Sequence, residues 1–190
     1  DGLALCRQIL TDAPNDAEAL HLMGLISHRG GDSGAAVGLI RQAITINSSN
    51  PGYHCNLGVM LRALGQNEEA VAVLRRAIEI NPELADSHYN LANVLKVLRD
   101  FKNAEIHYKK AIEISPNFAN AHNNLGQLYK DQAKMDLSID AHRQSLVADP
   151  SSAMTHSNLG MLLRQAGHLT EALSHYGMAL ALAPKDSLRV

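Results

Sequence analysis

Apolar residues recur along the chain in two alternating blocks at helical spacing, with a short polar or glycine-containing joint between the blocks. In the stretch 51–84 the blocks contain Leu57, Met60 and Leu61, and then Val71, Leu74, Ala77 and Ile78. Steps of three and four residues place side chains on one face of an α-helix. Because the joints are short, the two helices must be antiparallel neighbours. The pattern predicts helical hairpins, each made of a helix A and a helix B.

The hairpin pattern repeats with a period of 34 residues. A motif with His in first place, Asn in third and Leu in fourth begins at His54, His88, His122 and His156. Proline cannot continue a helix, and prolines share one phase of the period. They are Pro14, Pro82, Pro116, Pro150 and Pro184, with Ser48 in the missing place. A fixed period of this length is typical of a solenoid of stacked units rather than a globule with one core.

These marks divide the chain into five units with a partial unit at each end. The predicted units are residues 17–50, 51–84, 85–118, 119–152 and 153–186. Residues 1–16 match only the helix B of a unit, and residues 187–190 begin a further unit. The last helix B ends in the apolar run 178–183, whereas a terminal repeat usually has a polar outer face. We expect further helices or a second domain to cover it; the alternative is self-association through this apolar C-terminal helix.

Composition and charge narrow the class of protein and of partner. The 190 residues are 46% hydrophobic and 4% aromatic, lack Trp and carry a net charge of −2. This composition favours close-packed helices, and the acidic balance argues against nucleic acid or an anionic membrane as partner. No apolar run approaches the ~18 residues of a membrane span, and no signal-peptide pattern begins the chain. Cys6 and Cys55 lie in different predicted helices, so we expect no disulfide and a soluble, cytoplasmic protein.

Small and apolar residues occupy the same places in every unit, and together they resemble a known family. In the unit 85–118 they are Leu91, Ala92, Leu95, Ala104, Tyr108, Ala111 and Pro116. In the unit 153–186 they are Leu159, Gly160, Leu163, Ala172, Tyr176, Ala179 and Pro184. This pattern resembles the tetratricopeptide repeat over essentially the whole chain. The resemblance implies an all-α, right-handed superhelical solenoid whose A helices line a concave groove for extended peptides or partner helices.

Two units depart from the family pattern. The unit 119–152 has Ser138, His142 and Ser145 where Ala, an aromatic residue or Leu, and Ala are usual. We therefore expect its helix B to be the least well packed. The first unit has Leu20 and Leu22 where the other units have His and Asn, which places it outside the expected binding stretch.

The sixth residue of four successive units is an asparagine: Asn56, Asn90, Asn124 and Asn158. A primary amide offers one acceptor and two donors, so it can pair with both the N–H and the C=O of an extended backbone. Asparagine has a poor helix propensity and has no reason to recur in mid-helix for folding alone. We interpret the four residues as a peptide-binding ladder along the groove; the alternative is that they form hydrogen bonds between repeats.

Other positions of the same face would determine which peptide binds. The twelfth residues of the units form a basic row: His28, Arg62, Lys96, Lys130 and Arg164. Asn93 and Gln127 lie between this row and the asparagines. A basic stripe favours acidic or phosphorylated partner segments, and the alternative is a set of solvated charges on exposed turns. We thus expect a protein or peptide partner, and neither nucleic acid nor membrane.

No catalytic residue, cofactor or metal site is predicted. The chain has no phosphate-cradling glycine loop, no nucleophile elbow and no Cys/His motif with metal-ligand spacing. Neighbouring A helices should place the histidines of the column 54, 88, 122 and 156 about 10 Å apart, too far to share an ion at bonds of ~2 Å. We interpret these histidines as packing residues.

The predicted function is therefore a non-enzymatic protein–protein interaction scaffold. The alternative is the substrate-recruiting arm of a multidomain glycosyltransferase or similar transferase, whose catalytic domain lies outside this sequence. This alternative rests on the Asn-Leu-Gly run, which resembles the repeats of O-linked N-acetylglucosamine transferases. A pentatricopeptide RNA binder is the nearest non-protein alternative, but its period is one residue longer and the acidic balance counts against phosphate binding.

Overall fold

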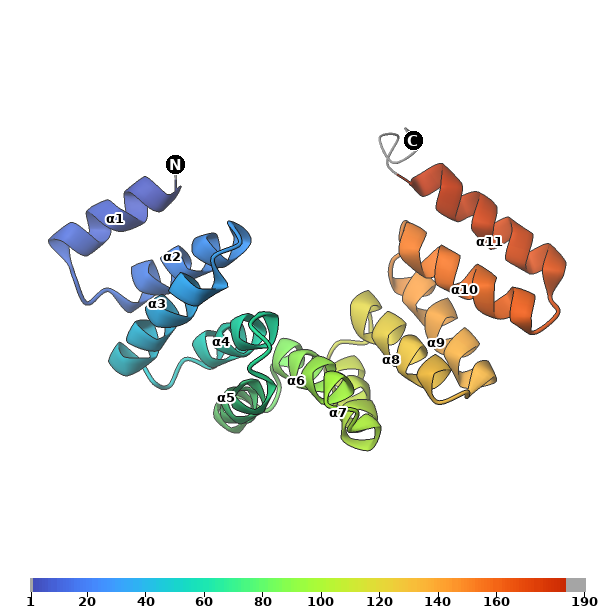
Figure 1. Cartoon of the computed structure of the whole chain (residues 1–190), viewed down its shortest axis with the longest axis horizontal. Helices are drawn as coiled ribbons and strands as arrows, with labels where there is room; N and C mark the ends of the chain where they lie inside the picture. The colour runs from blue at the N-terminus through green and yellow to red at the C-terminus, as the bar shows by residue number, and fades with distance from the viewer. Residues whose placement is uncertain (1, 184–190) are drawn as a thin grey trace. The chain divides into compact units, whose positions relative to one another are not determined.

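The computed structural model describes residues 2–183, and this range contains eleven α-helices and no strand. The first helix is α1 (Gly2–Asp12). The A helices are α2 (Ala17–Arg29), α4 (Pro51–Ala63), α6 (Ala85–Val97), α8 (Ala119–Asp131) and α10 (Ala153–Gln165). The B helices are α3 (Ser33–Ile46), α5 (Asn67–Ile80), α7 (Phe101–Ile114), α9 (Met135–Ala148) and α11 (Leu169–Leu182) (Figure 1). The all-α prediction is confirmed. Predictions for residues 184–190, including Pro184 and a further unit from 187, lie outside the described residues.

Short polar side chains start several of these helices. Asp16 accepts a hydrogen bond from the backbone N–H of Ala19 at 2.8 Å, and Asp32 accepts one from Ala35 at 2.9 Å. Such caps satisfy N–H groups that have no partner inside the helix. The two caps fix where α2 and α3 begin, and therefore which residues of each helix face the neighbouring helix.

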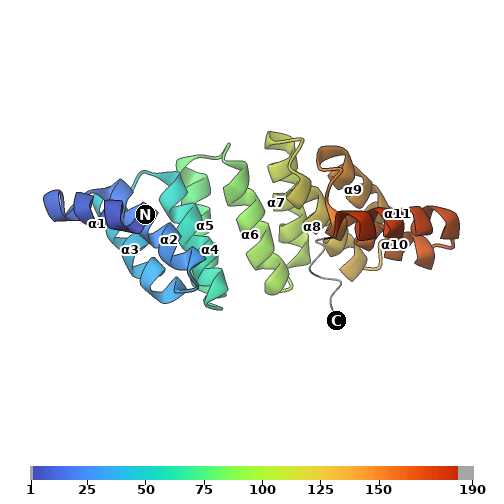
Figure 2. The same cartoon turned by 90° about the horizontal axis from the view of Figure 1, so that it is seen from above.

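The described residues form two compact units, one ending at His107 and the other beginning at Tyr108. In the first unit α2 pairs with α3 and α4 with α5, and each B helix also packs against the following A helix. Successive A helices contact each other as well, α2 with α4 and α4 with α6. In the second unit α8 pairs with α9, α9 packs against α10, and α10 lies beside α11 (Figures 1 and 2). Each hairpin thus buries apolar surface both internally and against its neighbour.

Helices A and B approach most closely at the eighth residue of a unit, which is glycine in four of the five units. A Cβ atom at Gly58 would overlap Cγ of Leu74, and one at Gly160 would lie 3.0 Å from the ring of Tyr176. Leu74 is fully buried. The size of the residue at this position therefore sets how closely the two helices can pack.

The joint between α8 and α9 is one of two joints in which a residue with a side chain adopts a left-handed backbone. Glycine fills the equivalent place at Gly31, Gly65 and Gly167, with φ of 92°, 75° and 85°. Arg99 and Ala133 fill it with φ of 61° and 58°. A Cβ atom makes this conformation unfavourable by about 1–2 kcal/mol, whereas glycine adopts it freely.

We expect Ala133→Gly to stabilise the protein, because glycine removes the Cβ penalty at this joint. A gain of about 1 kcal/mol corresponds to a rise in melting temperature of about 2–4 °C for a chain of this size, measured by circular dichroism. Gly65→Ala makes the reverse change in an equivalent joint and should lower the melting temperature by a similar amount. Equal melting temperatures for Ala133→Gly and the wild type would contradict the proposed strain.

Helix α9 carries the unusual polar residues of the fourth repeat, and two of them are satisfied inside the hairpin. The hydroxyl of Ser138 donates to the carbonyl of Gly126 at 2.7 Å, and that of Ser145 donates to Ala119 at 2.9 Å. His142 is fully buried, and neither of its ring nitrogens has a hydrogen-bond partner among the described residues. Burial, with the charge of Lys130 as a smaller cause, lowers the pKa of His142 to about 4. The departure from the family pattern thus leaves one buried polar side chain without a partner.

The outer side of α11 is apolar and exposed in the described part of the chain. Leu169, Leu173 and Leu180 are each at least 60% exposed, while α10 covers the other side of the helix (Figures 1 and 2). An apolar surface of this kind indicates a contact site. What covers it, further helices or a second copy, stays a prediction. At 14 residues, the longest described helices are too short to be candidates for crossing a bilayer.

Candidate functional site

The predicted asparagine ladder lies at the junctions between successive A helices. Each asparagine reaches back to the residue 35 places earlier in the chain. Asn56 Nδ2 donates to Nε2 of His21 at 2.8 Å, and Asn90 Nδ2 donates to Sγ of Cys55 at 3.4 Å. In the second compact unit Asn158 Nδ2 donates to Oδ1 of Asn123 at 3.4 Å. In these three cases one amide N–H therefore joins two repeats, as the inter-repeat interpretation expects.

The amides remain partly open on their other side. Asn56, Asn90 and Asn158 are half-buried, and among residues 2–183 their amide oxygens accept no hydrogen bond. An amide held by one N–H and open at its oxygen has a fixed orientation and can still bind a further group. The inter-repeat interpretation and the ladder interpretation are thus compatible at the same side chain.

In the second unit the asparagines belong to a buried polar network between α8 and α10. Asn123, which is 5% exposed, accepts hydrogen bonds at Oδ1 from Thr155 Oγ1 at 3.3 Å and from Asn158. Its Nδ2 donates to Oδ1 of Asn124 at 3.3 Å. Asn124 is thus engaged by its own neighbour in the helix. The sequence gives little warning of this network, because Asn123 is the only asparagine at the fifth place of a unit.

A hollow of about 300 Å³ lies where α4 and α6 meet in the first unit. It is lined by Gly52, Cys55, Asn56, Leu84, Asp86 and Asn90. Two of the predicted ladder residues are therefore brought together around one concave site, and the exposed carboxylate of Asp86 joins them. Burial is the main reason why the pKa of the Cys55 thiol is raised, so this wall of the hollow is uncharged at neutral pH.

The basic row occupies the last turns of the A helices. Arg62 is exposed at the end of α4, and Lys96 is half-buried at the end of α6. In the second unit Arg164 is exposed, while Lys130 Nζ lies 3.8 Å from Sδ of Met161. Cations at this end of a helix are favoured by the helix dipole. This gives the row a structural reason that the sequence argument did not consider.

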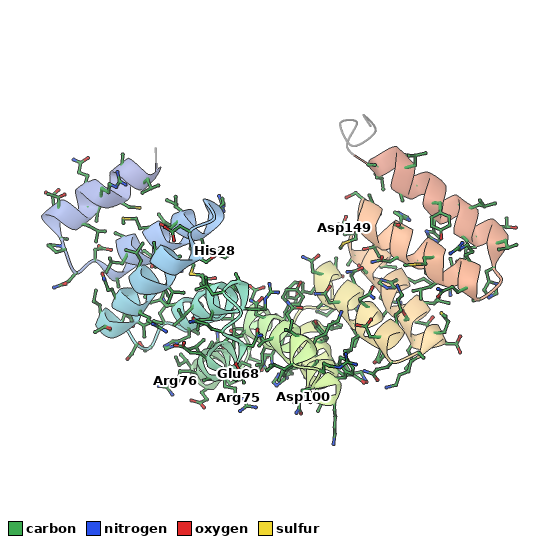
Figure 3. The ribbon with its side chains drawn as sticks, viewed as in Figure 1. His28, Glu68, Arg75, Arg76, Asp100 and Asp149 are labelled. Atoms are coloured by element: carbon green, nitrogen blue, oxygen red, sulfur yellow. The ribbon has the colours of Figure 1, made fainter. Side chains whose placement is uncertain are left out.

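Three further predicted residues have local contacts. His28, labelled at the end of α2 in Figure 3, pairs through Nδ1 with the hydroxyl of Ser33 at 2.8 Å. Gln127 Nε2 donates to Oδ1 of Asp131 one turn along α8 at 3.4 Å. Asn93 is half-buried. His28 and Gln127 thus have contacts inside their own repeat, whereas the hollow contains two of the asparagines.

The column of histidines fastens each A helix to the end of the preceding repeat. Nε2 of His54, His88, His122 and His156 lies 2.9–3.1 Å from the backbone carbonyls of Ser48, Pro82, Pro116 and Pro150, respectively. These carbonyls belong to the residues that break the preceding helices. The contact explains why histidine recurs at the place where the family usually has a bulky residue. Within residues 2–183 no three His, Cys, Asp or Glu side chains are grouped to hold a metal ion.

Sequence reasoning missed a second histidine in two of the repeats. Nδ1 of His88 lies 3.0 Å from Nδ1 of His107, and Nδ1 of His156 lies 2.9 Å from Nδ1 of His175. His107 and His175 are on the B helices. The signal in the sequence is a separation of 19 residues in both repeats, which has meaning only once the register of the hairpin is known.

Stacked helical hairpins with a recurring polar face on the A helices define a helical-repeat protein. Four profiles of the tetratricopeptide repeat match the sequence, over residues 58–97, 85–118, 107–142 and 153–186. The chain therefore belongs to the tetratricopeptide repeat family, whose repeats serve as scaffolds for protein interactions. No curated relative matches the sequence.

Solved structures with the same fold are numerous, and all of those compared here share little sequence with this chain. MamA from Desulfovibrio magneticus RS-1 superposes with a TM-score of 0.74 at 20% identity, covering 92% of this chain and 97% of that one. BtubC from P. vanneervenii gives 0.79 at 21% identity, with 95% and 86% covered. YrrB, described as a tetratricopeptide repeat protein with an unusual peptide-binding site, gives 0.67 at 19% identity, with 96% and 94% covered. At these identities the likeness shows the fold alone.

Proposed function

We propose that this chain binds an extended segment of a partner protein on the polar face of its A helices, centred on the hollow between α4 and α6. The observation that carries the proposal is the placement of Asn56 and Asn90 on the wall of one hollow of about 300 Å³. That YrrB, with the same fold, is described as having a peptide-binding site adds support by analogy.

The hydrogen bonds at the repeat junctions prepare the two asparagines for this role. Because Asn56 and Asn90 each donate one N–H to the preceding repeat, their amides do not have to lose rotational freedom when a peptide binds. The open oxygen and the second N–H match the N–H and C=O of an extended backbone. Each such hydrogen bond contributes about 1 kcal/mol net, which gives an affinity that depends on further contacts.

Charge supplies those further contacts. Arg62 and Lys96 lie ten residues along their helices from the start of the face, which is about 15 Å from the hollow at the helical rise of ~1.5 Å per residue. Asp86 stands at the other end, beside the hollow. We propose that the partner segment has acidic or phosphorylated residues over Arg62 and Lys96, and no negative charge opposite Asp86. Lys130 and Arg164 would extend the same selection on the second unit.

Selection from a library of unstructured twelve-residue peptides, followed by fluorescence anisotropy on the best binder, would test the proposal. We expect the double variant Asn56→Ala, Asn90→Ala to lose at least about tenfold in affinity, since two to four hydrogen bonds are removed. Arg62→Gln should abolish part of the salt dependence of binding.

The matched control is His21→Ala, which removes the acceptor of Asn56 but lines no part of the hollow. It should lower the melting temperature while changing the affinity less than about threefold, because less than 1 kcal/mol of binding is at stake. If the double asparagine variant melted lower but bound the peptide as tightly as the wild type, the asparagines would serve only to join repeats, and the proposal would be wrong.

A further inference from the structure

The third and fifth repeats contain the same pair of facing imidazoles. The ring centroids of His88 and His107 are 5.2 Å apart, and those of His156 and His175 are 5.1 Å apart. The Nδ1 atoms are only 3.0 and 2.9 Å apart, so in each pair the nitrogens lie between the two rings. Each pair joins helix A to helix B of one hairpin, and each lies within a single compact unit.

The first histidine of each pair is held in one tautomer by the backbone. Nε2 of His88 donates to the carbonyl of Pro82 at 3.0 Å, and Nε2 of His156 donates to that of Pro150 at 3.1 Å. The proton is therefore on Nε2, and the lone pair is on Nδ1, which faces the second histidine. A carbonyl that accepts from the remote ring nitrogen is the usual support of a metal-bound imidazole, because it fixes both the tautomer and the ring orientation.

We propose that each pair binds one Cu²⁺ or Ni²⁺ ion through its two Nδ1 atoms, with water completing the coordination. Two nitrogens at right angles around an ion, with bonds of about 2.0–2.1 Å, are about 2.9 Å apart. This spacing matches both pairs. The wider tetrahedral angle that Zn²⁺ prefers separates its ligands by about 3.3 Å, so Zn²⁺ should bind more weakly than Cu²⁺.

Binding requires one proton to move within the second histidine of each pair. In the metal-free pair His107 donates its Nδ1 proton to His88, and His175 donates to His156. On binding, that proton leaves Nδ1 and is replaced by one on Nε2 of the same ring, so that no net proton is released. His107 and His175 are half-buried rather than enclosed. Burial and the neighbouring histidine lower the pKa of both rings, so they are neutral at pH 7 and available to a metal ion.

Charges near the two pairs differ, and this predicts an order of affinity. The positive charge of Arg75, labelled on α5 in Figure 3, acts on His107, and that of Arg143 acts on His175. Only the second pair also has a carboxylate beside it, since Glu171 Oε1 lies 4.0 Å from Nε2 of His175. We expect the pair in the fifth repeat to bind Cu²⁺ more tightly. With two protein ligands at each site, both affinities should fall in the micromolar range.

The chain contains its own controls. His54 and His122 make the same carbonyl contacts as His88 and His156. The residues 19 places later are Val73 and Ala141, which have no metal-binding group. The second and fourth repeats should therefore bind no ion, although they have the same first histidine.

Titration of the untagged protein with Cu²⁺ and with Ni²⁺, followed by calorimetry and by electron paramagnetic resonance of the Cu²⁺ form, tests the proposal. We expect two ions per chain and nitrogen coupling from two imidazoles at each. His107→Val and His175→Ala, which copy the residues of the second and fourth repeats, should each remove one ion. His54→Gln should leave two ions bound.

A gain of binding is the sharper test. Val73→His places a second histidine opposite His54 and should raise the stoichiometry from two to three. Retention of two ions by the double variant His107→Val, His175→Ala would overturn the proposal. So would the absence of binding by the wild type at millimolar Cu²⁺ while circular dichroism shows it to be folded.

Discussion

Replacing His142 by leucine is expected to stabilise the protein by about 1–3 kcal/mol. A neutral imidazole always carries one N–H, and in His142 that donor is fully buried without a partner among the described residues. An unsatisfied buried donor costs about this much relative to water. Leucine fills the equivalent place in the second repeat, where Leu74 packs over Gly58 as His142 packs over Gly126. The melting temperature should rise by about 2–4 °C for each kcal/mol.

The gain should increase as the pH is lowered. The pKa of His142 is about 4 in the folded protein, whereas that of an unfolded histidine is about 6.5. Between these values the unfolded state binds the extra proton, so the wild type loses stability as the pH falls from about 7 to 4, by up to about 1.4 kcal/mol per pH unit from this residue. His142→Leu removes that loss. His107, whose pKa is also about 4, contributes the same loss to both proteins.

The reverse substitution in the second repeat provides the control. Leu74→His places an imidazole over Gly58 in a fully buried position, and it should destabilise the protein more at pH 5 than at pH 7.5. Denaturant melts at the two pH values measure both effects. A His142→Leu protein with the stability and pH dependence of the wild type would mean that an internal water satisfies the ring.

Replacing Gly58 by leucine is the change expected to destabilise most. The position faces Leu74 so closely that even a Cβ atom would overlap its Cγ. A leucine side chain must therefore push α5 away from α4, and overpacking of this kind costs about 1–3 kcal/mol or somewhat more. The melting temperature of the variant should fall by several degrees, as measured by circular dichroism.

Gly38→Leu is the matched control for the loss of a helical glycine. Gly38 is also inside a helix, but a Cβ atom there would meet nothing within 4 Å. Leucine has a higher helix propensity than glycine, by roughly 0.5–1 kcal/mol, so this variant should be as stable as the wild type or more stable. Opposite shifts for the two variants support the assigned contact between α4 and α5; equal shifts would contradict it.

The fold could be predicted from the sequence because its signals are local and repeated. The phase of the prolines, the joints and the spacing of small residues such as Gly126 and Gly160 locate each helix without any knowledge of distant contacts. The backbone conformation of Arg99 and Ala133 could not be predicted in this way. At both joints the hairpin geometry, rather than the residue, imposes the positive φ.

The candidate site was less accessible to prediction, for a geometric reason. Helical periodicity places Asn56 and Asn90 on one face, but not how far successive A helices are rotated about their axes. That rotation brings Cys55 to Asn90 and His21 to Asn56. The pairing of His88 with His107 depends likewise on the register between the helices of a hairpin. Both contacts are between elements, and only the three-dimensional structure reveals them.

The hydrogen bond from the sixth residue of one repeat to the fifth residue of the repeat before it has an evolutionary consequence. The acceptor is a ring nitrogen in His21, a thiol sulfur in Cys55 and an amide oxygen in Asn123. The donor is an asparagine amide in every case, so the joint tolerates any acceptor in the earlier repeat. A tandem duplication of residues 51–84 would place a new Asn56 after Cys55 and form a compatible junction at once. Arrays of this protein can therefore lengthen by whole repeats without coordinated mutation at the seams.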